Sequence, residues 1–523
     1  MREGTDARRL SLGGRPDLAP GQHGAFCLRP SPAFRAERPL SRHPDSPRAP
    51  LTGLGRRGRQ TGPVEPKGVL LVDRGGLPFV MCPDTGCKGV GIPASAALWL
   101  GKNGMQNSFE SFIRRFIRHG SLEVETPAGK RIQAGDGSGH ALGLRFKDER
   151  AQWRLLADPE LAFGELYMEG AMEVTRGTLL DVMQLVLANL VQAGQTRWLS
   201  LLHVLRTQLR ALAQLNDPFR AQKNVAHHYD LDHRLYDLFL DFDKQYSCAY
   251  FEYAGQSLEE AQRAKKRHIA AKLLIEPGQR VLDIGSGWGG MALYLAHLCE
   301  ARVTGVTLSA EQLSIASRRA AESALTAPPE FHLRDYRAEE GRYQRIVSVG
   351  MFEHVGLGYY DAFFRKISDL LTDDGVALIH TIGRPDVPSA TNPFIAKYIF
   401  PGGHLPTLSE IMPAIERSGL IVTDVEILRL HYALTLQHWQ ARFQAHRDEI
   451  VRLYDERFCR MWEFYLAGSE ATFRLGQAVN FQIQLAKRVD TVPLTRDYIG
   501  RTEYALRLKE NSAQQHVAHL RQA

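Results

Sequence analysis

A glycine-rich stretch at residues 281–290, VLDIGSGWGG, has the residue types and spacing of a cofactor-binding turn. Its apolar start predicts a strand, and the residues after the turn predict a helix. The stretch satisfies the dinucleotide pattern G-x-G-x-x-G, which also needs an acid about 20 residues later to hold a ribose. The next predicted strand ends in GVTLS, residues 305–309, without an acid. The dinucleotide interpretation therefore fails its second requirement.

Asp283 precedes the first glycine by two residues and completes a D-x-G-x-G-x-G pattern with Gly285, Gly287 and Gly289. This pattern is typical of class I methyltransferases. The glycines let the backbone approach a cofactor closely, and Asp283 can hold the loop or meet the cationic amino-acid end of S-adenosylmethionine. On this turn alone, another nucleotide ligand and a purely structural turn stay open as alternatives.

Further segments, in this order and spacing, closely resemble the cyclopropane-fatty-acyl-phospholipid synthases, which are related to the mycolic acid cyclopropane synthases. The resemblance covers about 220–490 and, more weakly, 105–195. The segments that carry it are NVAHHYDLDHRLYDLFLDFDKQYSCAYF (224–251), VTGVTLSAEQ (303–312), LRDYR (333–337), IVSVGMFEHVG (346–356), LIHTIG (378–383) and FIAKYIFPGGHLP (394–406).

The resemblance implies transfer of a methylene group from S-adenosylmethionine to the cis double bond of an unsaturated phospholipid acyl chain. The expected products are a cyclopropane fatty acyl chain and S-adenosylhomocysteine, and a bound bicarbonate is expected to act as the base. The residues that match the family's catalytic, bicarbonate-binding set are Cys248, Glu353, His380, the backbone of Ile382, and Tyr432, the last from the weaker match HYALTLQHW at 431–439.

The resemblance also assigns a cofactor-binding set. Its members are Tyr246, Ser247, Asp283, Gly285, Gly287, Gly289, Thr307, Leu308, Ser309, Gln312, Asp335 and Tyr336. In this set the segment from Thr307 to Gln312 takes the ribose role usually given to an acid, and Asp335 accepts from the adenine amino group. The sequence departs from the family at Ser469, where some members carry a cysteine assigned as catalytic, and at Ser286, where a cysteine is common.

The residue types of the catalytic set suit this chemistry. Glu353 and His380 fall at the ends of predicted strands, at the carboxyl edge where doubly wound sheets bind ligands. A carboxylate repels bicarbonate unless one of the two is protonated or nearby groups donate hydrogen bonds. A helix N-terminal acid at Glu353, a core histidine at His380 and a small buried hydrophobe at Cys248 are the structural alternatives.

Four aromatic side chains are expected to line a hydrophobic acyl pocket and to stabilise positive charge through their π faces. They are Tyr398, Phe400, Tyr432 and Trp439. The histidines at 227 and 228 with Asp230 resemble metal ligands, but no third group supports them, and we expect no metal.

The elements that must position these residues alternate along the chain. Strands are predicted at 280–284, 302–307, 345–349 and 376–381, with helices at 290–299, 310–323 and 359–371 and mostly helix after about 405. This order predicts an α/β fold, the Rossmann-like doubly wound sheet of a class I methyltransferase with helical additions, over 220–510.

Upstream of that domain the patterning is weaker. Helical spacing at 109–117, a hairpin at 122–133, a strand at 142–146 and a helix at 179–190 predict a small α+β lipid-docking domain over 105–195. An amphipathic connecting helix is expected at 196–219. Arginines on both basic helices suit a membrane surface, although a core-facing stripe with arginines reaching to solvent explains them as well. Residues 1–104 are expected to be a disordered tail or the product of a misassigned start, with Met105 the suspected start.

Composition excludes several classes of function. The 523 residues carry a net charge of +7, but residues 1–60 hold twelve arginines and five acids and so account for all of it. The remaining chain is neutral, which argues against nucleic acid as a partner. Six scattered cysteines indicate no disulfide framework. We expect a cytoplasmic enzyme, peripherally associated with the inner face of the membrane, with unsaturated phospholipid as its partner and room for a homodimer.

Two rival functions stay open. An enzyme of the same fold could methylate the acyl chain without closing the ring, because the first step is shared. A catalytically silent lipid-binding or scaffold protein could keep the fold, since fold alone does not decide function.

Overall fold

The computed structural model describes residues 102–192, 206–207 and 233–522, and two expectations fall largely outside them. The predicted tail at 1–104 is described only from 102, where helix α2 (Lys102–Phe116) begins. The predicted connecting helix at 196–219 is described only at 206–207. The histidines at 227 and 228 with Asp230 also lie outside the described residues.

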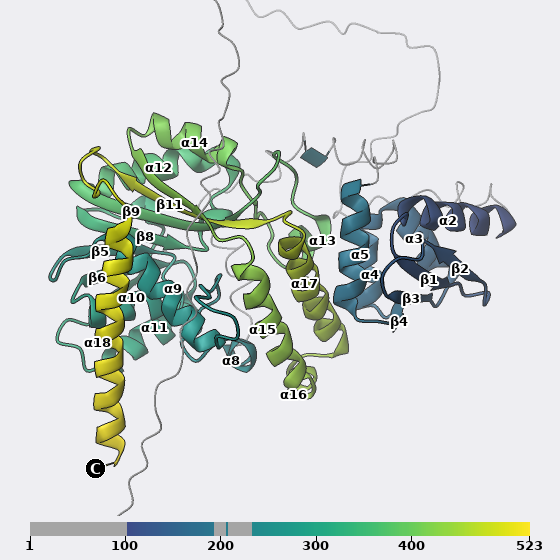
Figure 1. Cartoon of the computed structure of the whole chain (residues 1–523), viewed down its shortest axis with the longest axis horizontal. Coiled ribbons are helices and arrows are strands. Elements are labelled where there is room, and N and C mark those ends of the chain that lie inside the picture. The colour runs from purple at the N-terminus through teal and green to yellow at the C-terminus, as the bar shows by residue number, and fades with distance from the viewer. Residues whose placement is uncertain (1–101, 193–205, 208–232, 523) are drawn as a thin grey trace, which may run out of the picture. The chain divides into compact units, whose positions relative to one another are not determined.

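A four-stranded sheet of order β2-β1-β3-β4 forms the N-terminal part of the described chain (Figure 1). The predicted hairpin is present, because β1 pairs antiparallel with β2, while β3 runs parallel to β1. The elements are β1 (Ser121–Glu125), β2 (Arg131–Ala134), β3 (Ala141–Phe146), α3 (Glu149–Ala157), α4 (Pro159–Met168), β4 (Met172–Arg176) and α5 (Leu179–Gln192). One face of α2 packs Phe109, Ile113 and Ile117 into this core, so its apolar stripe faces inward.

A seven-stranded sheet of order β10-β11-β9-β8-β5-β6-β7 organises the rest of the chain. Strands β5 to β9 pair in parallel, and β11 is antiparallel to both of its neighbours. The strands are β5 (Arg280–Ile284), β6 (Arg302–Thr307), β7 (Glu330–Leu333), β8 (Tyr343–Val349), β9 (Leu371–Gly383), β10 (Ile421–Ile427) and β11 (Val479–Ala486). The sheet has the doubly wound α/β architecture that the sequence predicts.

The C-terminal third is mostly helical, as predicted, but it also contributes β10 and β11, which were not predicted and which complete the sheet. Residues 479–486, VNFQIQLA, alternate polar and apolar side chains, which is a strand pattern. Strand β9 also extends beyond the predicted end at 381 to Gly383, because β11 pairs with it as far as Val479. His380 therefore lies inside a strand.

Helices cover both faces of the large sheet (Figure 1). Leu282 and Ile284 pack with α12 (Tyr360–Leu370) and α14 (Leu408–Arg417). Val281, one residue out of phase, packs on the other face with α9 (Leu258–Leu273), α10 (Gly290–Leu298) and α18 (Asp497–Gln522). Successive side chains of a strand point to opposite faces, so Asp283 shares the α9 face with Val281. Strand β9 behaves likewise, since Leu378 packs on the α9 face and His380 follows it by two residues.

An aromatic cluster joins the helical additions to the N-terminal part. It contains Trp439 and Phe443 of α15 (His431–Ala445) and Trp462 of α17 (Glu456–Arg474). Helix α17 contacts both α4 and α5, and Phe464 packs 4.7 Å from the ring of Phe394 on α13 (Pro393–Tyr398). The other helical elements here are α8 (His233–Phe239), α11 (Ala310–Glu322) and α16 (Arg447–Leu453).

Helix α9 is held by an ionic network that reaches β10 and α18. His268 is 4% exposed, and its ring nitrogens contact Glu426 of β10 and Glu503 of α18, each at 2.7 Å. Lys272 pairs with the same Glu426. Burial acts to lower the pKa of His268, but the hydrogen bonds that its ring donates to the two glutamates outweigh burial and raise it. The protonated ring is therefore the form that holds the two glutamates together.

We expect His268→Gln to destabilise the fold more in acid than in base. A histidine with a raised folded-state pKa contributes its full charge-dependent stability below its ordinary pKa and loses it as pH rises through the folded value. The loss should be about 2 kcal/mol near pH 6 and smaller near pH 9, measured by urea unfolding. The exposed His297 of α10 provides the control, His297→Gln. An equal loss at both pH values would contradict the network's dependence on charge.

Candidate active site

The glycine-rich turn lies at the switch point of the large sheet. Strand β5 pairs with β6 on one side and β8 on the other, and such a point leaves a crevice at the carboxyl ends of the strands. Gly285 has φ +82°, and a Cβ there would lie 2.8 Å from the Met351 side chain. The turn therefore requires glycine at this position, as the sequence pattern suggested.

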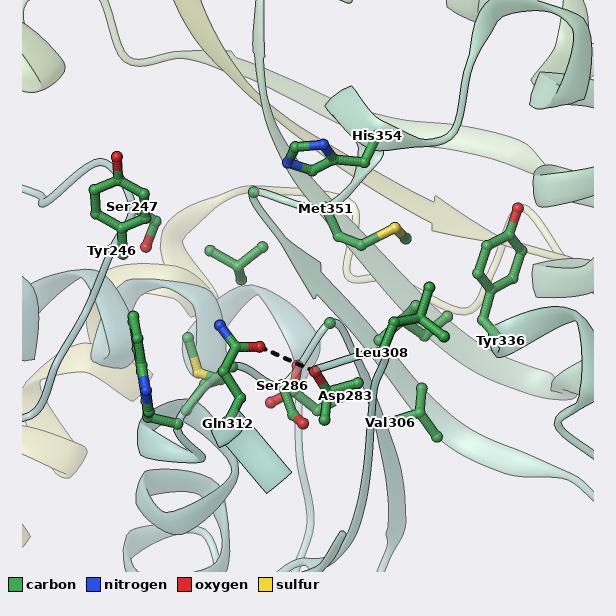
Figure 2. A pocket seen from close by; sticks show the side chains of 18 of the residues that line it. Tyr246, Ser247, Asp283, Ser286, Val306, Leu308, Gln312, Tyr336, Met351 and His354 are labelled. Carbon is green, nitrogen blue, oxygen red and sulfur yellow. Dashed lines mark hydrogen bonds between the residues drawn. The ribbon is translucent and has the colours of Figure 1, made fainter. Parts of the chain in front are cut away.

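An open cavity of about 1110 Å³, open solvent included, occupies this crevice. Figure 2 shows Tyr246 and Ser247 across the cavity from Tyr336, with Met351 and His354 on a third side. Ten of the twelve residues predicted to hold the cofactor line it: Tyr246, Ser247, Asp283, Gly285, Gly287, Thr307, Leu308, Gln312, Asp335 and Tyr336.

Gly289 and Ser309 are not among the lining residues and have local structural roles. Gly289 is the N-cap of α10 with φ +83°, and a Cβ there would lie 2.8 Å from the ring of Phe331. Ser309 is the N-cap of α11, where its hydroxyl accepts from the backbone N–H of Gln312 at 3.2 Å. Both residues therefore fix the start of a helix beside the cavity without lining it.

Asp283 is buried without a counter-ion in contact. It is 2% exposed, and among the described residues its Oδ2 has no hydrogen-bond partner. Burial raises the pKa of Asp283 to about 7, and the positive charge of Lys265 acts in the opposite direction. A buried carboxylate with a free oxygen in the cavity wall fits a cationic ligand such as an α-amino group.

The ribose and adenine sides of the predicted site are held by side-chain pairs. Thr307 Oγ1 donates to Gln312 Oε1 at 3.0 Å, the dashed line in Figure 2. Asp335 accepts from the Arg337 guanidinium at 2.8 and 2.6 Å, so its carboxylate is fixed in place. The remaining oxygen lone pairs of Asp335 can accept from a further donor.

Glu353 links the ends of two neighbouring strands. It lies on a short 3-10 helix, η2 (Phe352–His354), just after β8, and its Oε1 accepts from the backbone N–H of Ile382 on β9 at 2.6 Å. The side chain is buried, and among the described residues Oε2 has no hydrogen-bond partner. Burial raises the pKa of Glu353 to about 7, although the Ile382 hydrogen bond lowers it. The carboxyl group can therefore gain or lose a proton near neutral pH.

His380 is clamped by two amides from β11. Its Nε2 contacts Asn480 Nδ2 and its Nδ1 contacts Gln482 Nε2, at 2.5 and 3.1 Å. Burial lowers the pKa of His380 well below its ordinary value, and the charge of Lys265 adds to this effect. The ring is therefore neutral, and because a neutral imidazole accepts at only one nitrogen, only one of the two amide N–H₂ groups donates to it.

Cys248, Ile382 and Tyr432 come together in the aromatic cluster, although they lie on separate elements. Cys248 is 1% exposed, its Sγ lies 3.4 Å from the carbonyl oxygen of Ala249, and burial raises the pKa of its thiol. Tyr432, on α15, packs edge-on to Trp439 with ring centroids 5.8 Å apart. The residues that line the cofactor cavity include none of the five residues of the predicted catalytic set.

The four predicted pocket aromatics also belong to this cluster or pack against it. Tyr398 has a second attachment, because its hydroxyl donates to Glu165 of α4 at 2.9 Å. Lys397 donates to the same carboxylate oxygen at 2.7 Å. The N-terminal part therefore holds α13, the helix that carries Tyr398.

Sequence reasoning missed several residues of the site. Met351 and His354 line the cavity and lie in the quoted stretch MFEHVG, where attention went to Glu353. Burial lowers the pKa of His354 to about 4, so it is neutral. Asn480 and Gln482 could have been found from the alternation of β11, which places them on one face of a strand.

Comparison with known proteins identifies the family. Residues 216–483 match the family described as mycolic acid cyclopropane synthetase. The chain is 37% identical over 351 residues to an Escherichia coli protein named cyclopropane-fatty-acyl-phospholipid synthase, a match that covers 66% of this chain and 88% of the relative. The chain belongs to the mycolic acid cyclopropane synthetase family. It is also 40% identical over 271 residues, 50% of this chain and 68% of the relative, to a Pseudomonas putida protein named probable fatty acid methyltransferase.

Solved structures agree with this membership. The cyclopropane synthase MmaA2 from Mycobacterium tuberculosis is 33% identical with a TM-score of 0.50, and the match covers 52% of this chain and 99% of that one. Coclaurine N-methyltransferase bound to N-methylheliamine and S-adenosylhomocysteine has a TM-score of 0.51 at 22% identity, which shows the fold alone, over 62% of this chain and 99% of that one. This family member is a class I, S-adenosylmethionine-dependent methyltransferase.

The described residues of this family member contain neither a metal-binding cluster nor a membrane-spanning helix. Within 102–192, 206–207 and 233–522, no group of three or more histidine, cysteine or acidic side chains is arranged to hold a metal ion. Over the same residues, no helix is both long enough and apolar enough to span a bilayer.

We expect Asp283→Asn to weaken S-adenosylhomocysteine binding roughly tenfold near pH 7, because an amide cannot attract the ammonium group as a charge. In the wild type, affinity should fall as pH drops through about 7, where the Asp283 carboxylate becomes protonated. In the variant this dependence should become shallower. Calorimetric titrations between about pH 6 and pH 8.5 measure both effects.

Asp335→Asn is the matched control, because Asp335 lines the same cavity and is paired with Arg337. That variant should keep the wild-type pH profile. A wild-type affinity that does not change with pH would contradict the role of Asp283.

Proposed function

We propose that this chain is a cyclopropane-fatty-acyl-phospholipid synthase. It would transfer a methylene group from S-adenosylmethionine to the cis double bond of an unsaturated phospholipid acyl chain and leave S-adenosylhomocysteine. The observation that carries the proposal is the position of Glu353. Its neighbours Met351 and His354 line the cofactor cavity, and its hydrogen-bond partner Ile382 packs against the aromatic cluster. A buried, titratable carboxyl group thus lies between the cofactor side and the apolar side.

The proposed reaction needs a proton acceptor at that boundary. Bound S-adenosylmethionine supplies the methyl carbon, and ring closure releases one proton from it. Glu353 meets the requirement for acid–base work, because its pKa of about 7 allows both protonation states near neutral pH. The orphan Oε2 atom is the position at which it would exchange a proton or hold a small anion.

Bicarbonate as the base is part of this proposal, and the structure favours some of the expected contacts over others. The Ile382 N–H is engaged by Glu353 itself, and each ring nitrogen of His380 faces a side-chain amide, one of which donates to it. Glu353 Oε2 and the side chains of Cys248 and Tyr432 are the groups of the set that would touch the anion. His380 would act by fixing β9 and β11. The ionised Glu353 can accept a hydrogen bond from the bicarbonate O–H, which offsets the repulsion between the two anions and leaves the other bicarbonate oxygens to take the proton.

The aromatic cluster suits an apolar substrate and a transient positive charge. Tyr246 stacks on Trp439 at 5.0 Å between centroids, and Phe400 lies 5.8 Å from Tyr465. Such rings exclude water and present their negative faces to a developing cation. Ser469, where some relatives carry a cysteine, lies on α17, five residues before its end; we propose that this departure leaves the chemistry intact.

A membrane surface is the proposed location of the substrate. Arg114, Arg115 and Arg118 are exposed at the end of α2, opposite its buried stripe, and a basic face of this kind attracts anionic lipid headgroups. The proposal includes peripheral association with the inner face of the cytoplasmic membrane and a homodimer as the working form.

The testing experiment uses purified full-length protein, S-adenosylmethionine and vesicles of a cis-monounsaturated phospholipid. Mass spectrometry of the fatty methyl esters after methanolysis should show a gain of one CH₂ unit without a double bond. A gain of one CH₂ unit with an alkene retained would instead support methylation without ring closure. That second candidate is favoured by the Pseudomonas putida relative's name, probable fatty acid methyltransferase.

Glu353→Gln should lower turnover by roughly 10²–10⁴-fold and leave S-adenosylhomocysteine binding unchanged, because the amide cannot exchange the proton. Wild-type turnover should rise with pH through about 7, as Glu353 ionises. The buried Glu510 of α18, 6% exposed and paired with Arg267, gives the matched control, Glu510→Gln. Turnover of Glu353→Gln within threefold of the wild type would contradict the assignment.

Two substitutions of Tyr398 distinguish stabilisation by the ring face from positioning by the hydroxyl group. Tyr398→Phe removes only the hydrogen bond to Glu165 and should keep turnover within about threefold. Tyr398→Leu removes the ring and should lower turnover about 5- to 30-fold, the equivalent of 1–2 kcal/mol for a cation–π contact. Equal turnover of the two variants in the vesicle assay would show that the ring face contributes nothing.

A further inference from the structure

The short segment Gln245–Cys248 forms a wall between the two halves of the site. Gln245, Tyr246 and Ser247 line the cofactor cavity, whereas Cys248, the next residue, is buried in the aromatic cluster. The segment belongs to no helix or strand. Its conformation must therefore be fixed by contacts from other elements.

Helix α9 supplies those contacts from beneath. Gln262 Nε2 donates to the backbone carbonyl oxygens of Gln245 and Ser247 at 3.1 and 3.0 Å. One turn further along the helix, Lys265 Nζ donates to Gln245 Oε1 and to Ser247 Oγ, both at 2.7 Å. Two residues of one helix turn thus hold two backbone carbonyl groups of the wall and its Gln245 and Ser247 side chains.

Lys265 is a costly residue for this purpose alone. It is 0% exposed, and its two hydrogen bonds go to neutral acceptors rather than to a carboxylate. A buried ammonium without a contacting counter-ion is unfavourable. Burial lowers the pKa of Lys265 to about 7, with Asp241 and Asp243 acting to raise it and Lys266 to lower it.

The charge of Lys265 reaches both halves of the site. It lowers the pKa of Asp283 on β5 and of the Cys248 thiol, and it disfavours the protonated form of His380 on β9. Asp283 and His380 are both on the sheet face that α9 covers. Lys265 is thus placed to stabilise the ionised form of the carboxylate that would meet a cationic cofactor.

We propose that Lys265 is a positioning residue of the methyl-transfer site: its ammonium group fixes Ser247 and Gln245 as the cofactor-side wall, on the sheet face that carries Asp283, the carboxylate that would receive the amino group of S-adenosylmethionine. The proposal deepens the proposed function and rests on it only for the effect on turnover. Cofactor binding is measured separately, so the two can fail independently.

The test compares wild-type protein with Lys265→Met, a side chain of similar length that carries neither charge nor hydrogen-bond donor. S-adenosylhomocysteine affinity is measured by calorimetry between about pH 6 and pH 8.5. We expect binding roughly tenfold weaker at pH 7 and an affinity midpoint at least half a pH unit higher, because the charge that lowers the pKa of Asp283 is gone. With vesicles, kcat should also fall at saturating S-adenosylmethionine.

Lys272→Met is the matched control. Lys272 is on the same helix and is also 0% exposed, but it pairs with Glu426 of β10. Its loss should lower the unfolding temperature while the affinity midpoint stays at the wild-type pH. A purely structural Lys265 would behave in the same way.

A double-mutant cycle of Lys265→Met with Ser247→Ala checks the route of action. If Lys265 acts through the wall, the losses in affinity should be smaller in combination than their sum. The proposal is overturned if Lys265→Met folds and binds S-adenosylhomocysteine within twofold of the wild type at an unchanged midpoint. If that variant does not fold, the pair Gln245→Ala with Ser247→Ala decides, and wild-type affinity there would also overturn it.

Failure of the proposed function would give a different result. Wild-type protein that binds S-adenosylhomocysteine but gives no altered fatty ester would contradict the synthase proposal and leave the binding comparison intact.

Discussion

Burial of positive charge on α9 is the constraint on which the rest of the catalytic fold depends. Five basic side chains of this one helix are nearly inaccessible to solvent: Lys265, Lys266, Arg267, His268 and Lys272. A buried charge is tolerated only where other groups solvate it, so each of these residues dictates where another segment must lie. The wall at 245–248 supplies the acceptors of Lys265, while β10 and α18 supply carboxylates for His268. The elements that complete the sheet and close the site are thus tied to a single helix.

The two halves of the site use burial in different ways. On the cofactor side, Asp283 is left without a hydrogen-bonding partner on Oδ2 among the described residues and faces a cavity open to solvent. On the apolar side, His380 has both ring nitrogens next to side-chain amides, and its neutrality is fixed by its surroundings. Glu353 lies between them with one oxygen tied to Ile382 and the other free of such ties. The arrangement thus leaves polar atoms of Asp283 and Glu353 available for a ligand, whereas the ring nitrogens of His380 face side-chain amides.

The elements that short sequence patterns define were predicted correctly. Strands β5 and β6 have the predicted bounds, because short apolar runs ending in glycine or serine turns need no distant partner to be recognised. The family resemblance located ten cavity-lining residues for the same reason, since they are contiguous in short motifs. Strands β10 and β11 were missed because their pairing partners lie far away in sequence and helices dominate their surroundings. The burial of α9 could not be predicted, because the largely basic sequence AKKRH at 264–268 is typical of an exposed helix. The groups that accept their hydrogen bonds are known only from the folded structure.

Because Glu165 of α4 accepts a hydrogen bond from Tyr398 of α13, the position of Tyr398 in the catalytic part depends on the N-terminal part. Gly164 beside it has no room for a side chain, because a Cβ would lie 2.4 Å from the ring of Phe394 on the same helix α13. Substitutions at these α4 positions would therefore displace α13, and a tolerated change in one helix would need a compensating change in the other. The family match over residues 216–483 includes α13 but not α4. A chimaera of this chain and a homologue would therefore have to take α4 and α13 from the same parent.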